Sequence, residues 1–195
     1  MPNQSIFHNS NQFLYSDATN TYTSPETIAP PTQDASVNGL SYMASASNTG
    51  SLGILGGTII VSLQLSNPAA SGRRLYITSF EGSIDISLSV LSSFSGTSAI
   101  VSGGSLSLPA AVTARNLRLG SSTASVVTAR SSISAVSGGT TFMTYPLQPA
   151  SFRLEYPSSI IVPEGQAVTL TVSGSLSILG SLSTYASITW WEAAV

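Results

Sequence analysis

The chain has 195 residues, of which 42% are hydrophobic and only 7% are charged, and its formal net charge is -2. This length suits one domain with a well-buried core, and so much apolar content with so little charge excludes a disordered chain. The near-neutral balance removes the electrostatic basis for binding nucleic acid or an anionic membrane, and the absence of cysteine excludes disulfides and thiolate metal sites.

Residues 1–50 differ in composition from the rest of the chain. They hold the only histidine, no arginine, and clusters of Asn, Gln, Ser and Thr without a sustained period, which is typical of an extended arm. The arm has more apolar side chains than an inert linker needs, so we expect it to dock on a neighbouring copy or, alternatively, on its own domain. The candidate docking residues of the arm are Phe7, Phe13, Leu14, Tyr15, Asp17 and Tyr22.

From Gly50 onward, short segments alternate apolar side chains with Ser or Thr, the period of two that marks a half-buried strand. No long segment has a helical period. The predicted strands are 58–65, 73–80, 83–90, 97–101, 105–108, 125–133, 140–146, 152–156, 160–162, 167–172 and 185–190, with 113–119 as strand or loop. About nine to eleven short strands predict an all-β, antiparallel sandwich over residues 51–195, of the single jelly-roll type rather than a closed barrel.

Local patterns also predict neighbours. Strands 58–65 and 73–80 are expected to form a hairpin, and strands 167–172 and 185–190 an antiparallel pair. Two near-repeats stand out: residues 49–56 resemble 173–180, and residues 101–104 resemble 136–139. We expect the first two to be neighbours at one edge or at a subunit contact, the alternative being chance repetition in a chain rich in Ser, Gly and Leu.

The sequence predicts neither a catalytic site nor a metal or cofactor site. His8 is alone in the arm, and one imidazole makes neither a zinc site nor a triad. Glu81 and Asp85 are the acids closest in sequence, and four residues apart on one extended strand their Cα atoms would be about 13 Å apart at a rise of about 3.3 Å per residue. We therefore expect a protein that is not an enzyme.

Arg115, Arg118 and Arg130 form the only concentrated positive region. Arginine is the cation most often used in interfaces, so we predict that these three contact the acidic arm of another copy, for example at Asp17. The alternative is that they are paired within the fold or solvated.

Trp190 and Trp191 are adjacent on the last predicted strand, so one indole is expected in the core and the other at the surface. We predict that Trp191 is covered by a second copy. A sugar stacked on the outer indole is the alternative.

Three segments, NPAASGRRLYI, IIVPEGQAVTLTV and SITWWE, give the chain a resemblance to known proteins. Over about residues 50–192 it resembles the single-jelly-roll structural proteins of bacterial spore-surface appendages and of bacteriophage fibres or virion shells. The resemblance implies self-assembly, with an N-terminal extension that docks on the next subunit. Spore-appendage subunits carry cysteines that cross-link the fibre, and this chain has none.

The sequence thus predicts a structural subunit that assembles with copies of itself into a fibre, tube or shell, through edge strands and the N-terminal arm. We expect it on the exterior of a cell, spore or virus particle, reached without a visible secretion signal, because the first residues have neither a basic nor an apolar region. The alternative is a carbohydrate-binding or adhesion module that binds surface glycans through Trp191, Tyr145 or Tyr156.

Overall fold

The computed structural model describes residues 7–9, 12–14, 31–88 and 92–195, and the chain divides into two units, Met1–Pro30 and Pro31–Val195. In the first unit, β1 (Phe7–Asn9) pairs antiparallel with β2 (Gln12–Leu14), with Phe7 opposite Leu14. Three of the candidate docking residues, Tyr15, Asp17 and Tyr22, lie outside the described residues.

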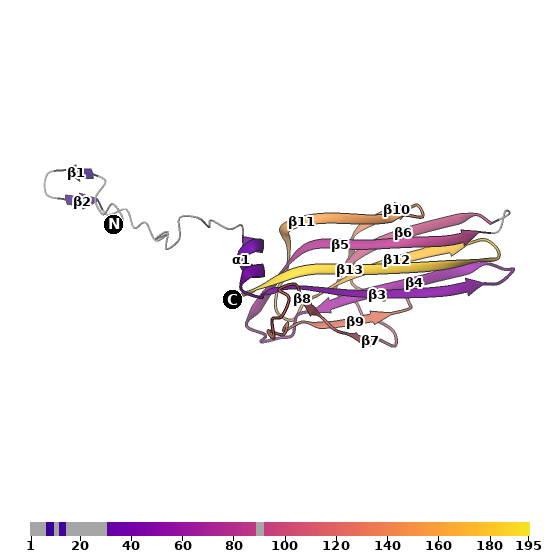
Figure 1. Ribbon diagram of the computed structural model, residues 1–195, viewed down its shortest axis with the longest axis horizontal. Helices are drawn as coiled ribbons and strands as arrows, with labels where there is room; N and C mark the ends of the chain where they lie inside the picture. The colour runs from indigo at the N-terminus through magenta and orange to yellow at the C-terminus, as the bar shows by residue number, and fades with distance from the viewer. Residues whose placement is uncertain (1–6, 10–11, 15–30, 89–91) are drawn as a thin grey trace. The chain divides into compact units, whose positions relative to one another are not determined.

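The second unit is a sandwich of two antiparallel sheets (Figure 1), which confirms the predicted fold class. One sheet has the strand order β10-β6-β12-β4-β9-β7 and the other β11-β5-β13-β3-β8. The elements are α1 (Pro31–Val37), β3 (Ser41–Leu52), β4 (Gly57–Ser66), β5 (Arg73–Leu88), β6 (Phe94–Ser102), β7 (Ala110–Val112), β8 (Arg115–Asn116), β9 (Thr128–Ser132), β10 (Thr140–Leu147), β11 (Ser151–Val162), β12 (Ala167–Leu176) and β13 (Gly180–Ala194).

The eight long strands have jelly-roll connectivity. The first four pair with the last four in reverse order, β3 with β13, β4 with β12, β5 with β11 and β6 with β10. Consecutive long strands therefore mostly alternate between the sheets. The two predicted local pairings are therefore wrong. β4 and β5 lie in different sheets, and so do β12 and β13. Alternation identifies a strand and its buried face, but not its partner.

The predicted boundary at residue 50 is also wrong. β3 begins at Ser41 and lies between β13 and β8, with Tyr42 and Ala44 fully buried, so the sandwich starts well before residue 50. The short helix α1 precedes it in the same unit. The inward face of β3 includes Ala44 and Ala46, and such small side chains give only weak hydrophobic alternation.

The core lies between the sheets. Large side chains from the inner strands meet there with no exposed surface, among them Trp190, Phe80, Leu63, Leu170 and Ile188. Trp190 stacks on Tyr42 at a ring-centroid distance of 5.9 Å. Because Trp190 points inward, its neighbour Trp191 lies on the outer face of the five-stranded sheet, as the alternation predicts.

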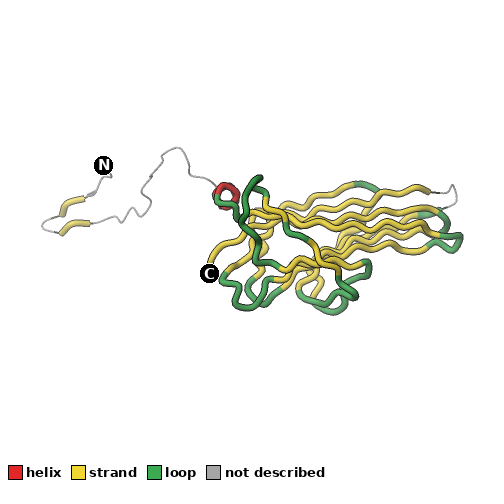
Figure 2. The backbone as a smooth tube through the Cα atoms, turned by 60° about the horizontal axis from the view of Figure 1, so that its bottom comes forward, coloured by secondary structure: helices red, strands yellow, loops and turns green. Residues whose placement is uncertain are grey.

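The long strands share one axis, so the sandwich has two ends (Figure 2). We call one end the base: it holds α1, the connections 67–72 and 163–166, and the C-terminus. Backbone hydrogen bonds join these segments, from Asn67 N to Gln166 O at 2.9 Å and from Val195 N to Gly72 O at 3.1 Å. The other end, formed by the connections 53–56 and 177–179, we call the tip.

The near-repeats are spatial neighbours, as expected for the first pair. Segments 49–56 and 173–180 meet at the tip, where Leu52 is opposite Gly180 and the hydroxyls of Thr58 and Ser175 are 3.0 Å apart. Segments 101–104 and 136–139 meet at the base, where Ser105 and Ser137 form a β-bridge. Similar sequences therefore build adjacent turns at each end.

Candidate functional site

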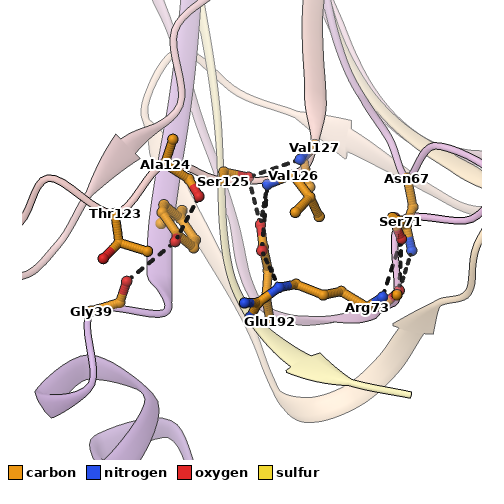
Figure 3. A network of polar contacts seen from close by, with 12 residues as sticks. Gly39, Asn67, Ser71, Arg73, Thr123, Ala124, Ser125, Val126, Val127 and Glu192 are labelled. Atoms are coloured by element: carbon orange, nitrogen blue, oxygen red, sulfur yellow. Dashed lines mark hydrogen bonds and ion pairs between the residues drawn. The ribbon is translucent and has the colours of Figure 1, made fainter.

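A buried carboxylate organises the base. Glu192 follows Trp190 on the inward face of β13 and is 1% exposed. Its Oε1 accepts hydrogen bonds from Ser125 Oγ at 2.5 Å and from the Val126 amide at 3.3 Å, and its Oε2 lies 3.8 Å from Nε of Arg73 (Figure 3). A carboxylate removed from water needs such donors around it, and here they come from segments far apart in the chain. The network therefore fastens the connection 123–127 to the last strand.

Tyr42 extends this network toward α1. Its hydroxyl lies 3.2 Å from the carbonyl oxygens of Gly39 and Ala124. Burial raises the pKa of Tyr42 above its usual value, the Glu192 carboxylate raises it further, and the Arg73 guanidinium lowers it. The turn before β3 and the connection after β8 are thus held to one phenol.

A second polar cluster closes the same end. Asn67 Nδ2 donates to the carbonyl oxygens of Arg73 at 2.8 Å and Val162 at 3.1 Å, and the Gly72 amide donates to Glu164. The bonds to Val162 and Glu164 join the β4–β5 connection to the β11–β12 connection. The bond from Asn67 to Arg73 is seen in Figure 3. Most of the polar groups in these two clusters hold loops, while Asn67 Oδ1 is buried without a hydrogen-bond partner.

Clusters of potential metal ligands are not found among the described residues. In residues 31–88 and 92–195, with the β1–β2 hairpin, no three His, Asp or Glu side chains gather as metal ligands. Within the same part of the chain, no helix has the length and apolar character needed to cross a bilayer.

The three predicted interface arginines are exposed but come from both sheets. Arg115 lies in β8, Arg118 just after it, and Arg130 in β9 of the other sheet. The ion pairs found among the described residues involve Arg73 and Arg153, and none involves these three. Their predicted contact with the arm remains a prediction.

The three aromatic side chains considered for glycan binding, Trp191, Tyr145 and Tyr156, lie on different parts of the sandwich. Trp191 stacks on Tyr76 with ring centroids 4.2 Å apart, and its indole N–H donates to Ser158 Oγ at 2.8 Å on the outer face. Tyr145 and Tyr156 instead lie in the edge strands β10 and β11, with their hydroxyls 3.1 Å apart. Trp191 and these tyrosines therefore do not form one surface, and the predicted subunit contact at Trp191 stays a prediction.

A hydroxyl-lined cleft of about 330 Å³ lies between α1 and the outer face of the five-stranded sheet. Arg153 forms part of its wall and pairs with Glu155 at 3.0 Å and with Glu81 at 3.4 Å. The hydroxyls in the lining come from Thr32, Ser36, Ser41, Thr78 and Thr189.

The two long sides of the sandwich differ. On one side both sheets end in long strands, β10 with 8 residues and β11 with 12. On the other side they end in β7 with 3 residues and β8 with 2. Figure 1 shows the two pairs on opposite sides. We call the first the open side.

Comparisons of the chain with models of protein families, with curated proteins and with solved structures find no match. The proposals below therefore rest on the geometry of this chain.

Proposed function

We propose that the protein is a structural subunit that assembles with copies of itself into a fibre, tube or shell on the exterior of a cell, spore or virus particle. The observation that carries the proposal is the open side, where β10 and β11 are the last strands of their sheets. An edge strand presents unpaired N–H and C=O groups, which are a template for a strand of another chain. Two such edges side by side favour association through strand addition.

The opposite side supports the same assignment by contrast. The segment between β6 and β10 lies along it: β9 pairs with β4, and the Ser134 carbonyl accepts a hydrogen bond from Ser62 at 2.8 Å. Short, covered edges resist pairing. The open side, where β10 and β11 are the outermost strands, therefore offers the longer terminal strands to a second copy.

Irregularities restrict where a strand can add. β10 contains Pro146 and a register shift at Phe142, and β11 shifts register between Glu155 and Ile160. Bulges and prolines interrupt edge pairing. We therefore assign the contact to the regular stretch 151–155 and to β10 between its bulge and its proline, with the N-terminal segment as the second contact.

Charge also favours stacking of identical copies. Two of the eight acids, Asp17 and Glu26, lie in residues 1–30, so the remaining six balance the six arginines of residues 31–195. A unit with no net charge repels its copies little.

Negative-stain microscopy of the full chain, of a truncation lacking residues 1–30 and of Thr144→Lys tests the proposal. We expect ordered polymers from the full chain and fewer or shorter ones from both variants, because Lys on an edge strand opposes pairing. The truncation ends at residue 30 because removing residues 1–50 would delete most of β3. A full chain that stays monomeric at all concentrations would reject self-assembly.

The hydroxyl-lined cleft supports one alternative, a carbohydrate-binding module. Hydroxyls beside an arginine and a carboxylate suit a polyhydroxylated ligand. Glycan binding by a monomeric form, abolished by Arg153→Ala, would favour this alternative over assembly.

A further inference from the structure

The tip presents apolar side chains to solvent. Ile54 is 78% exposed, Leu55 is 91% exposed and Leu179, from the neighbouring connection, is 52% exposed. Neither residues 35–72 nor residues 165–191 contain a charged side chain. The tip is therefore an uncharged apolar knob, a feature that commonly marks an interaction site.

Close backbone packing holds the knob in shape. Gly56 adopts a φ of 67°, and a Cβ at this position would lie 2.1 Å from the carbonyl oxygen of Leu176. Gly53 and Gly56 form a β-bridge beneath the exposed pair Ile54 and Leu55. The apolar pair therefore stands on a fixed turn and loses little freedom on binding.

The base carries an uncharged groove on the open side, lined mostly by apolar residues together with Ser102 and Gln166. It has a volume of about 240 Å³, and none of its lining residues is charged. Phe142 and Ile161 flank it with exposures of 44% and 48%, while Val162 and Val168 are almost fully buried. Phe142 occupies the register shift of β10, where a bulge redirects a side chain away from its own sheet.

The knob and the groove are at opposite ends of the molecule. β3 runs from base to tip over 12 residues, which at about 3.3 Å per residue is roughly 40 Å. Leu55 of one chain therefore does not reach Phe142 of the same chain. The apolar knob and the mostly apolar groove are both without charge and can pack against each other, and this contact is available only between two copies.

We propose that the tip of one copy, residues Gly53–Gly56 with Leu179, sits in the groove between Phe142 and Ile161 of the next copy. This inference rests on the proposed self-assembly and adds its axial contact. The contact joins two different surfaces of identical chains, so it does not close on itself in a pair and propagates in one direction. It gives the assembly a polarity, with all tips pointing the same way.

Disulfide trapping tests the contact directly, because the chain has no cysteine of its own. The variant Leu55→Cys/Phe142→Cys is prepared in the full chain and oxidised under assembly conditions. A disulfide needs Cα atoms within about 7 Å, so an intrachain bond across the sandwich is excluded. We expect a ladder of covalent multimers on non-reducing gels, and heterodimers when the two single variants are mixed.

The control is Leu55→Cys/Leu119→Cys, since Leu119 is 94% exposed and lies outside the groove. This control should give no ladder. If microscopy shows polymers but the Leu55–Phe142 pair cross-links no more than the control, the tip contact is wrong and self-assembly stands. If Leu55→Cys alone gives efficient homodimers, the tips meet each other and the contact is likewise wrong. If the full chain forms no polymers, both proposals fail.

A second measurement uses no cysteine. Leu55→Ser should raise the protein concentration at which polymers appear about tenfold or more, because burial of a leucine is lost from each contact. Leu119→Ser removes an equally exposed leucine elsewhere and should leave that concentration unchanged. Equal effects of the two substitutions would contradict the assignment.

Discussion

The base and the tip of the sandwich are stabilised in different ways. At the base, a buried carboxylate, a phenol and an asparagine hold loops through directional hydrogen bonds. At the tip, close backbone packing around a glycine holds the turns, and apolar side chains remain exposed. The loops of the base are held by polar side chains, whereas the turns of the tip are held by backbone packing and leave Ile54, Leu55 and Leu179 exposed. Changes in the buried polar network of the base should therefore act on folding, and changes at the exposed side chains of the tip on association.

The largest effect is expected at Glu192. Glu192→Ala should lower the free energy of unfolding by about 3 kcal/mol, because it leaves the Ser125 hydroxyl, the Val126 amide and the Arg73 guanidinium without their acceptor. Urea denaturation measures the change. The control is Glu155→Ala, which breaks an exposed ion pair and should cost less than about 0.5 kcal/mol. Equal losses would mean that the buried network does not hold the base.

Replacing one glycine by alanine at each end of the sandwich compares the tip with the base. Gly56 at the tip and Gly72 at the base have φ values of 67° and 68°, but a Cβ at Gly72 meets nothing within 4 Å. Gly72→Ala should cost about 1 kcal/mol through backbone strain alone, and Gly56→Ala about 2 to 3 kcal/mol because the Leu176 carbonyl must also move. Thermal unfolding of both variants checks this, and a ratio near one would contradict the close packing at the tip.

Alkaline titration probes burial of the tyrosines. Burial and, to a smaller extent, the hydrogen bond with the Tyr145 hydroxyl raise the pKa of Tyr156 to about 12. The pKa of Tyr42 at the base is also raised. Their unfolded-state pKa is lower, near 10, so both contribute stability that is complete below pH 10 and is lost as pH rises through the folded values. Phenolate absorbance should show a late phase near pH 12 that Tyr156→Phe removes. Ionisation of all tyrosines near pH 10 in the folded protein would contradict this.

The smallest effect on folding is expected at the knob itself. Leu55→Ser should change the free energy of unfolding by less than about 0.5 kcal/mol, because the side chain is 91% exposed in the single chain. Chemical denaturation below the assembly concentration measures it. A large loss would place Leu55 in the fold of its own copy and remove it from the proposed contact.

The sandwich fold could be predicted from the alternation of apolar and polar residues, but which strands pair with each other could not. Alternation identifies most of the long strands, whereas the jelly roll pairs β3 with β13, more than a hundred residues away. The sequence also predicts two strands, 73–80 and 83–90, where the structure has the single strand β5, which continues through Gly82 to Leu88. Gly82 is needed because a Cβ there would lie 2.6 Å from the ring of Phe152.

The polar network at the base was not predicted. Glu192 belongs to the alternating series that contains Trp190, so an acid at an inward position was the available signal. Its partner Ser125 is 67 residues away in the chain, and no local pattern connects the two. The exposed arginines were found from sequence because composition reveals surface charge, but their distribution over two sheets follows from the topology.

Sedimentation velocity of the full chain over a wide concentration range tests self-assembly most directly. We expect large species to replace the 20.0 kDa subunit as concentration rises, and we expect Leu55→Ser and the truncation lacking residues 1–30 to shift this change to higher concentration. A single 20.0 kDa species at every concentration would contradict self-assembly.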